Sequence, residues 1–215
     1  MKFLAAAAIL LLTTDPITAD DWPAWRGPAR DGVSAEKGLP EKWAADSGVL
    51  WKVALPAAAG ATPVIAGEFV FVASPSADGA KALLLCIGTD GKPRWERVVS
   101  GKSKDVKNLA SASPTTDGRS VWTYCATGEL ACFTVAGDEI WRADLQQRYG
   151  RFKLQFGMTT TPLVHEGTLY LQLIHSGGAW VVALDAATGA ERWKVERKSD
   201  GIDECEHSYA SIQLW

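Results

Sequence analysis

The sequence has few of the residues from which metal sites and disulfide frameworks are built. Its 215 residues include three histidines and four cysteines, and no two cysteines are adjacent or spaced as CxxC. The three histidines have no paired spacing with the cysteines, which argues against a metal site built from both residue types. Catalytic signatures are also missing, since there is no Gly-rich phosphate loop, no GxSxG and no HExxH.

Cys125 and Cys132 flank a predicted hairpin turn, which makes them the one pair to consider for a disulfide. If Thr127 and Gly128 form a two-residue loop, Cys132 lies opposite Thr123. The two sulfurs are then diagonal neighbours roughly 7 Å apart, too far for an unstrained bridge. Buried free thiols are the better interpretation of this pair, and a disulfide is the alternative.

Charge of one sign and long apolar runs are scarce as well. Lys and Arg number 22 and Asp and Glu 25, so the net charge of -3 excludes the basic surface of a nucleic-acid-binding protein.

The apolar run Phe3 to Leu12 has about ten residues, whereas a membrane span needs about 20. It follows Met1-Lys2 and precedes Ile17-Thr18-Ala19, the pattern of a secretory signal over residues 1–19. We expect a secreted or periplasmic protein with no membrane span after signal cleavage; an uncleaved anchor is the alternative.

Tryptophan, in contrast, is abundant, and four of the 10 tryptophans mark a repeat. Trp51, Trp95, Trp141 and Trp193 recur at intervals of 44, 46 and 52 residues. A second marker, a hydroxyl residue that mostly precedes proline, recurs in phase at intervals of 51, 48 and 50 residues: Thr62, Ser113, Thr161 and Ser211. Two markers with one period indicate an internal structural repeat.

Each period contains strand and turn signals and almost no helical periodicity. In the third period we expect strands at 162–165, 169–174, 180–185 and 191–196. The first period predicts strands at 64–65, 69–73, 83–87 and 94–99, and the second at 120–124, 130–134 and 139–142. Four short antiparallel strands in 45 to 50 residues are typical of a β-propeller blade. The predicted fold is therefore an all-β propeller with about three to four blades in this chain, its tryptophans buried where blades meet.

The segment Ala183 to Trp193 resembles the AxDxxTGxxxW tryptophan-docking motif of the pyrroloquinoline quinone (PQQ) repeat. That repeat builds the eight-bladed quinoprotein dehydrogenases and the BamB-type outer-membrane assembly factors. The leader Asp21 to Ser34 is similar to the entry segment of secreted bacterial PQQ-like proteins. The resemblance assigns a structural docking role to eight residues: Trp51, Trp95, Trp141, Ala183, Asp185, Thr188, Gly189 and Trp193.

The repeat divides the chain after the signal into a leader and blades. We expect a leader and closing strand at 20–59, blades at 60–99, 110–145 and 157–197, and the start of a next blade at 207–215. An eight-bladed ring of about 47 residues a blade plus the leader would need roughly 430 residues. The sequence is therefore interpreted as an N-terminal fragment of a longer protein. The alternative is that a second copy supplies the remaining blades.

Polar loops that recur in phase before the first strand of each repeat predict a shared partner-binding face. Their candidate residues are Lys107, Asn108, Ser111, Gln155, Phe156, Glu204, Glu206, His207 and Tyr209. Hydrogen bonds that cap neighbouring blades are the alternative role for these loops.

The predicted function is a non-catalytic scaffold or protein-binding module, similar to BamB, with protein partners in the cell envelope and no cofactor. The alternative is a fragment of a PQQ-dependent dehydrogenase that oxidises alcohols or sugars. The resemblance would then imply a vicinal disulfide over the quinone and oxygen ligands for calcium, and the sequence has no Cys-Cys pair.

Overall fold

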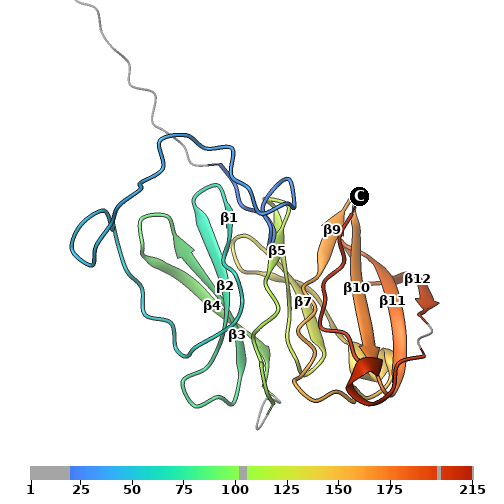
Figure 1. Ribbon diagram of the computed structural model, residues 1–215. Coiled ribbons are helices and arrows are strands. Elements are labelled where there is room, and N and C mark those ends of the chain that lie inside the picture. The colour runs from blue at the N-terminus through green and yellow to red at the C-terminus, as the bar shows by residue number, and fades with distance from the viewer. Residues whose placement is uncertain (1–19, 102–105, 198–199, 215) are drawn as a thin grey trace, which may run out of the picture.

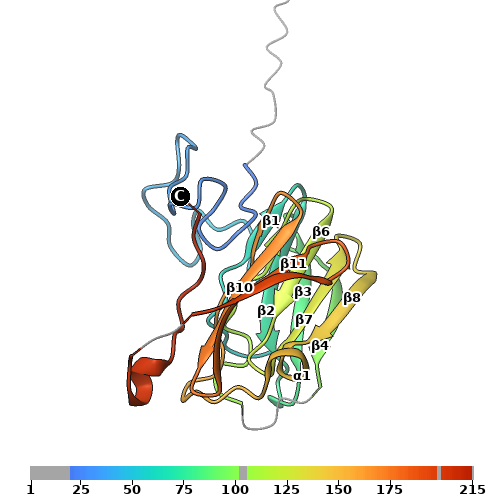
Figure 2. The same ribbon diagram turned by 90° about the vertical axis from the view of Figure 1, so that its right-hand side faces the viewer.

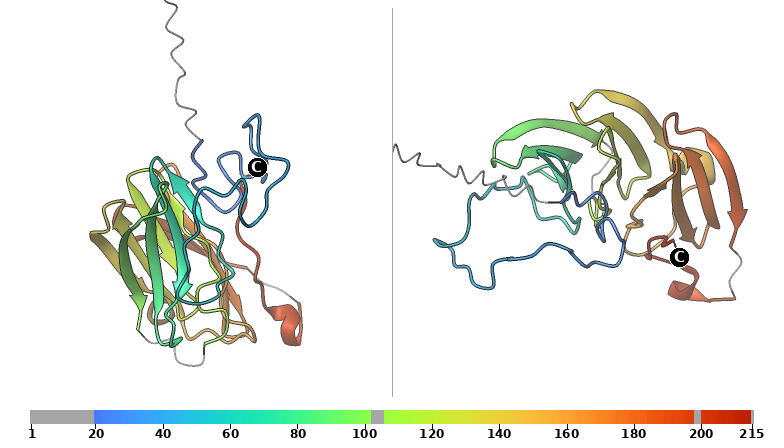
Figure 3. Two further views of the ribbon diagram at one scale, coloured as in Figure 1. Left: turned by 90° about the vertical axis from the view of Figure 1, so that its left-hand side faces the viewer. Right: turned by 90° about the horizontal axis from the view of Figure 1, so that it is seen from above.

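The structure is a computed structural model that describes residues 20–101, 106–197 and 200–214 (Figure 1). The signal sequence expected over residues 1–19 lies outside the described residues. Three four-stranded antiparallel sheets stand side by side and form an open arc when seen from above (Figure 3). The prediction of an all-β chain built from four-stranded propeller blades is confirmed.

Each blade has its four strands in sequence order, so every connection is a hairpin. The first blade consists of β1 (Val64–Ala66), β2 (Phe69–Pro75), β3 (Ala82–Gly88) and β4 (Pro93–Ser100). The second consists of β5 (Thr115–Thr116), β6 (Ser120–Tyr124), β7 (Glu129–Thr134) and β8 (Glu139–Asp144), followed by the short helix α1 (Leu145–Tyr149). The third consists of β9 (Leu163–His165), β10 (Thr168–His175), β11 (Gly178–Asp185) and β12 (Glu191–Glu196), followed by the 3-10 helix η1 (Asp203–Glu206).

The hairpins are tight because the turn residues accept left-handed backbone conformations. Between β9 and β10, Glu166 and Gly167 have φ angles of 47° and 68°. Positive φ at both central residues is the requirement of a type I′ turn, whose twist matches that of the flanking strands. The register follows from this turn, since Thr168 pairs with His165 directly across it.

Most of the core lies between the blades, and a smaller buried cluster of Val72, Leu83, Leu85 and Ile87 lies within the first blade. One buried cluster joins the first and second blades and includes Phe71, Leu84 and Phe133. A second joins the second and third blades and includes Tyr124 and Leu171. Inner strands are more buried than outer strands: all seven residues of β3 are buried, whereas all six residues of the outer strand β12 are exposed.

The leader lies across the first strands of all three blades. Trp22 forms an antiparallel bridge with Ile65, next to β1. The carbonyl oxygen of Pro23 accepts a hydrogen bond from the Thr116 N–H of β5 at 2.9 Å, and the Arg30 guanidinium donates to the Val164 carbonyl of β9 at 3.3 Å. The part of the leader that makes these contacts thus lies over the top face of the arc in Figures 1 and 2, and α1 and η1 lie at the opposite, bottom face.

The predicted register of the β6–β7 hairpin is wrong. Cys132 pairs with Trp122 rather than with Thr123. The loop is longer than the two residues expected: Cys125 itself belongs to it, and the Cys125 N–H donates to the Glu129 carbonyl. All four cysteines are free, and Cys86, Cys125 and Cys132 are buried.

Candidate functional site

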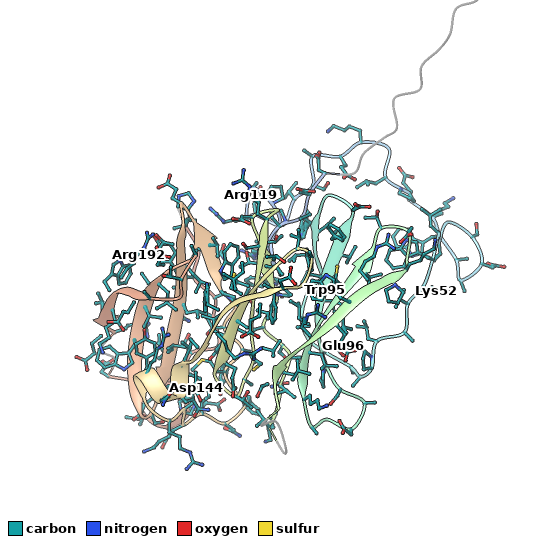
Figure 4. The ribbon with its side chains drawn as sticks, turned by 180° about the vertical axis from the view of Figure 1, so that it is seen from behind. Lys52, Trp95, Glu96, Arg119, Asp144 and Arg192 are labelled. Atoms are coloured by element: carbon teal, nitrogen blue, oxygen red, sulfur yellow. The ribbon has the colours of Figure 1, made fainter. Side chains whose placement is uncertain are left out.

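The in-phase tryptophans join the leader to the first blade and each blade to the next. The indole N–H of Trp51 donates to the Thr89 carbonyl at 2.7 Å, that of Trp95 to Val135 at 3.0 Å, and that of Trp141 to Ala186 at 2.9 Å. Each ring also lies on the turn glycine of the blade it contacts, namely Gly91, Gly137 and Gly189. A Cβ atom on any of these three glycines would lie between 2.6 and 2.9 Å from the ring. Figure 4 shows Trp95 between the first and second blades.

The motif residues of the third blade build the turn that receives Trp141. Asp185 accepts hydrogen bonds from the N–H and the hydroxyl of Thr188, both at 2.9 Å, and pairs with Arg192 at 2.8 Å. The Arg192 guanidinium, followed by Thr188, holds the pKa of the Asp185 carboxyl below its ordinary value. Ala183 is buried in β11 opposite Trp193. Trp193 contacts Tyr170 of its own blade and is 43% exposed.

The second sequence marker forms a chain of hydrogen bonds between blades. The backbone N–H of Thr62 donates to the Ser113 hydroxyl at 2.9 Å. The N–H of Ser113 donates to the Thr161 hydroxyl at 3.1 Å, and the N–H of Thr161 to the Ser211 hydroxyl at 2.9 Å. Each hydroxyl therefore satisfies a backbone donor of the preceding blade, which explains why the marker keeps the period of the tryptophans.

The loops before β5, before β9 and after η1 bring several of the predicted partner-binding residues together. The Lys107 ammonium lies 5.5 Å from the centre of the Phe156 ring, and the Asn108 amide donates to the Phe156 carbonyl at 2.8 Å. The Phe156 ring lies 6.0 Å from that of Tyr209, which lies 6.5 Å from His207. We call these four side chains, Lys107, Phe156, Tyr209 and His207, the aromatic ladder.

The other loop candidates surround the ladder without joining it. Ser111 lines a central cleft together with Tyr209, and Gln155 lines a cleft of about 430 Å³ between the β6–β7 turn and the segment 151–157. Glu204 and Glu206 belong to η1, where Glu204 is exposed and Glu206 is half-buried. Asn108 has a φ of 53°, a left-handed conformation that asparagine tolerates better than most residues.

Sequence reasoning missed a group of residues behind the ladder. His175 ends β10 and is 2% exposed, with the Phe152 ring 5.2 Å from its own. Ser176 follows it, and its hydroxyl lies 2.8 Å from the His207 Nε2 atom. The only signal in the sequence is that His175 immediately precedes the Ser-Gly-Gly turn, and this pattern does not indicate burial.

The central cleft, of about 360 Å³, is uncharged. Its lining consists of Trp25, Gly60, Asn108, Ser111, Ser113, Thr159, Thr161, Tyr209, Ala210 and Ser211. A calcium-bound quinone that carries several carboxylates would require carboxylate ligands and cationic partners. Within the described residues no three His, Cys, Asp or Glu side chains gather as a metal site. The described lining of this cleft therefore does not fit such a cofactor.

Comparison with known proteins identifies the repeat. A family model described as the β-propeller domain of glucose/ethanol/alcohol dehydrogenase matches residues 136–215. No curated protein sequence matches the chain. Among solved structures, the quinohemoprotein alcohol dehydrogenase of Comamonas testosteroni is similar with a TM-score of 0.64 and 19% identity, over 82% of this chain and 27% of that one.

Two further structures are similar over 68% of this chain, each with 18% identity. One is a quinohemoprotein alcohol dehydrogenase of Pseudomonas putida HK5, with a TM-score of 0.49 over 22% of its length. The other is BamB of Moraxella catarrhalis, with a TM-score of 0.41 over 51% of its length. This chain spans little more than a quarter of the length of the Comamonas enzyme.

The blades, their tryptophans and these matches define a β-propeller repeat protein. The PQQ propeller model matches residues 136–215, in line with the predicted resemblance, and the described residues form part of a propeller.

Proposed function

We propose that the chain is part of an exported propeller that binds a protein partner in the cell envelope and performs no catalysis itself. The aromatic ladder carries this proposal, because it gathers exposed and aromatic side chains from separate loops. Export rests on the signal-like residues 1–19. None of the described helices has the length and apolar character needed to span a membrane.

Phe156 has the properties of a binding anchor. Its ring is 39% exposed, while its backbone is fixed by the hydrogen bond from Asn108. The ring is further held between Lys107 and Tyr209, so little side-chain freedom is left to lose on binding. Aromatic side chains that combine apolar area with a fixed orientation are over-represented among residues that dominate binding energy.

The proposal is tested by photo-crosslinking followed by affinity measurement. A photoreactive amino acid at Phe156 of the exported protein identifies the neighbour, which is then purified. We expect Phe156→Ala to weaken binding of that partner by at least about tenfold, the effect of losing a central aromatic contact. Trp43→Ala is the matched control, since Trp43 is 70% exposed on the leader. Equal losses in the two variants would refute the assignment of the ladder as the binding site.

The second candidate function is a PQQ-dependent dehydrogenase, favoured by the family model that matches residues 136–215. It predicts dye-linked oxidation of alcohols or sugars that depends on added PQQ and Ca²⁺. A titration of the native protein with both, followed by dye reduction, separates the two functions. Stoichiometric binding of PQQ and Ca²⁺ with catalytic turnover would favour the dehydrogenase over the non-catalytic binding protein.

A further inference from the structure

A buried imidazole lies directly behind the aromatic ladder. His175 is 2% exposed, and its Nδ1 atom accepts a hydrogen bond from the Gly177 N–H at 3.0 Å. A nitrogen that accepts carries no proton, so the neutral ring holds its proton on Nε2. The Nε2 atom is buried and has no hydrogen-bond partner among the described residues.

The turn that follows His175 also holds the segment bearing Tyr209. The Ser176 hydroxyl lies 2.8 Å from His207 Nε2, and the Ser208 N–H donates to the Ile174 carbonyl at 3.2 Å. The Gln172 side chain donates to the Ser208 hydroxyl at 2.8 Å. We call these contacts between residues 172–177 and residues 207–208 the latch. They fix the position from which Tyr209 reaches Phe156.

Protonation of His175 is incompatible with the closed latch. The only free lone pair of the neutral ring is on Nδ1, so an added proton goes to the atom that accepts from Gly177. Two N–H donors would then face each other across 3.0 Å. The hydrogen bond from the Gly177 N–H to His175 Nδ1 is therefore lost. This bond stabilises the turn from which the Ser176 hydroxyl contacts His207.

The charges around His175 act in the same direction. Lys153, from the segment before β9, and His207, from the segment after η1, both oppose a positive charge on His175. Arg151 lies beside the turn, with its backbone carbonyl near Gly177. Burial, then His207 and then Lys153 lower the pKa of His175 below its ordinary value. The open state therefore binds more protons than the closed state, and stability of the closed latch falls as the pH falls.

We propose that the latch is a pH-sensitive switch that holds the aromatic ladder together at neutral pH and releases Tyr209 from Phe156 in acid. The role of this switch in binding rests on the proposed function of the ladder. The switch itself is a property of His175, Gly177, Ser176 and His207, and it operates without a partner.

Amide hydrogen exchange on the unliganded chain tests the switch. We expect protection of the Gly177 and Ser208 amides to fall between pH 7.5 and 5.5, after correction for the intrinsic exchange rate. Because the open ring has the ordinary pKa of 6.5 and the closed ring a lower one, the fall can reach about tenfold over this pH range. In His175→Gln the side-chain carbonyl can still accept from Gly177 but does not titrate, so protection there should be independent of pH.

His165→Gln is the matched control, because His165 is a partly exposed histidine beside Glu166 at the opposite end of β9 and β10. It should retain the full pH dependence. The proposal fails if His175→Gln keeps that dependence. If this variant does not fold, an NMR titration of the imidazoles in the wild-type chain decides: His175 titrating without any change at Ser208 would overturn the switch. Loss of partner binding in Phe156→Ala is a separate result, measured at pH 7.5.

Discussion

At the scale of single residues, the junctions between blades depend on glycines that no larger residue can replace. Gly137 has a φ of 94°, and the Trp95 ring occupies the space in which a side chain would stand. The same pairing occurs at Gly91 and Gly189. Each junction therefore requires its glycine for two reasons: the backbone has a positive φ, and the indole ring approaches too closely for a side chain.

We expect Gly137→Ala to destabilise the chain more than Gly118→Ala. Gly118 has a similar φ of 85° and no atom within 4 Å of the added Cβ, so its substitution costs about 1–2 kcal/mol of backbone strain. At Gly137 the clash with Trp95 adds about 1–3 kcal/mol. Urea unfolding of the two variants measures the difference. Equal losses would mean that the indole moves aside at no cost.

The cysteines should differ sharply in reactivity. Burial raises the pKa of Cys86 and of Cys132 to about 12 and that of Cys125 to about 11, and the thiolate is the reactive form. Cys205 is exposed. At pH 8 a thiol reagent should label one cysteine of the native chain and all four in denaturant. Rapid labelling of a second thiol would contradict the buried assignment, and mass spectrometry of the labelled peptides identifies which one reacts.

Residues whose partners lie at the repeat distance could be predicted, and residues with local or irregular partners could not. Trp95 and Trp141 are visible in the sequence because the same junction is built three times. Cys125 was placed wrongly because loop length in a single hairpin has no periodic counterpart. His175 was missed because its burial depends on Phe152 and on the segment after η1, neither of which repeats.

At the scale of elements, the strands of neighbouring blades are held in register by hydroxyl side chains. The Thr161 hydroxyl accepts from the buried N–H of Ser113, and Ser211 has the same role toward Thr161. The positions of these hydroxyls were predicted from the sequence, but their role as hydrogen-bond acceptors between blades was not. Their role is visible only once adjacent inner strands lie side by side, because each hydroxyl accepts from the backbone N–H of the equivalent residue one repeat earlier.

Thr161→Val should test this role with little change of shape. The variant leaves the buried Ser113 N–H without an acceptor, and we expect a loss of about 1–3 kcal/mol in the free energy of unfolding. Thr161→Ser, which keeps the hydroxyl used by the neighbouring repeats, should lose less than half as much. Exchange of the Ser113 amide should accelerate in the valine variant alone. A valine variant as stable as the wild type would show that water or another group replaces the hydroxyl.

At the scale of the whole molecule, the three blades form two junctions, and within the described residues two outer faces have no neighbouring blade. That of the first blade is contacted by Trp51 of the leader, and that of the third blade carries Trp193. Trp141 packs on Gly189 and donates to Ala186, whereas Trp193 occupies the equivalent place in the third blade and is 43% exposed. Val195, on the same outer strand, is 58% exposed. Trp141 and Trp193 therefore hold the same position in the repeat, and within the described residues Trp141 alone of the two contacts a following blade.

The different surroundings of Trp141 and Trp193 predict different effects of their replacement on stability. Trp141→Ala should destabilise the 215-residue chain by about 3–5 kcal/mol, as expected for a large aromatic side chain removed from a packed junction. Trp193→Ala should cost less than about 1 kcal/mol, since a substitution at an exposed position loses little packing. Both are measured by urea unfolding across a range of protein concentrations. A large, concentration-dependent loss at Trp193 would mean that a second copy covers this face in solution. A large loss at every concentration would mean that the outer face of the third blade is covered within the chain itself.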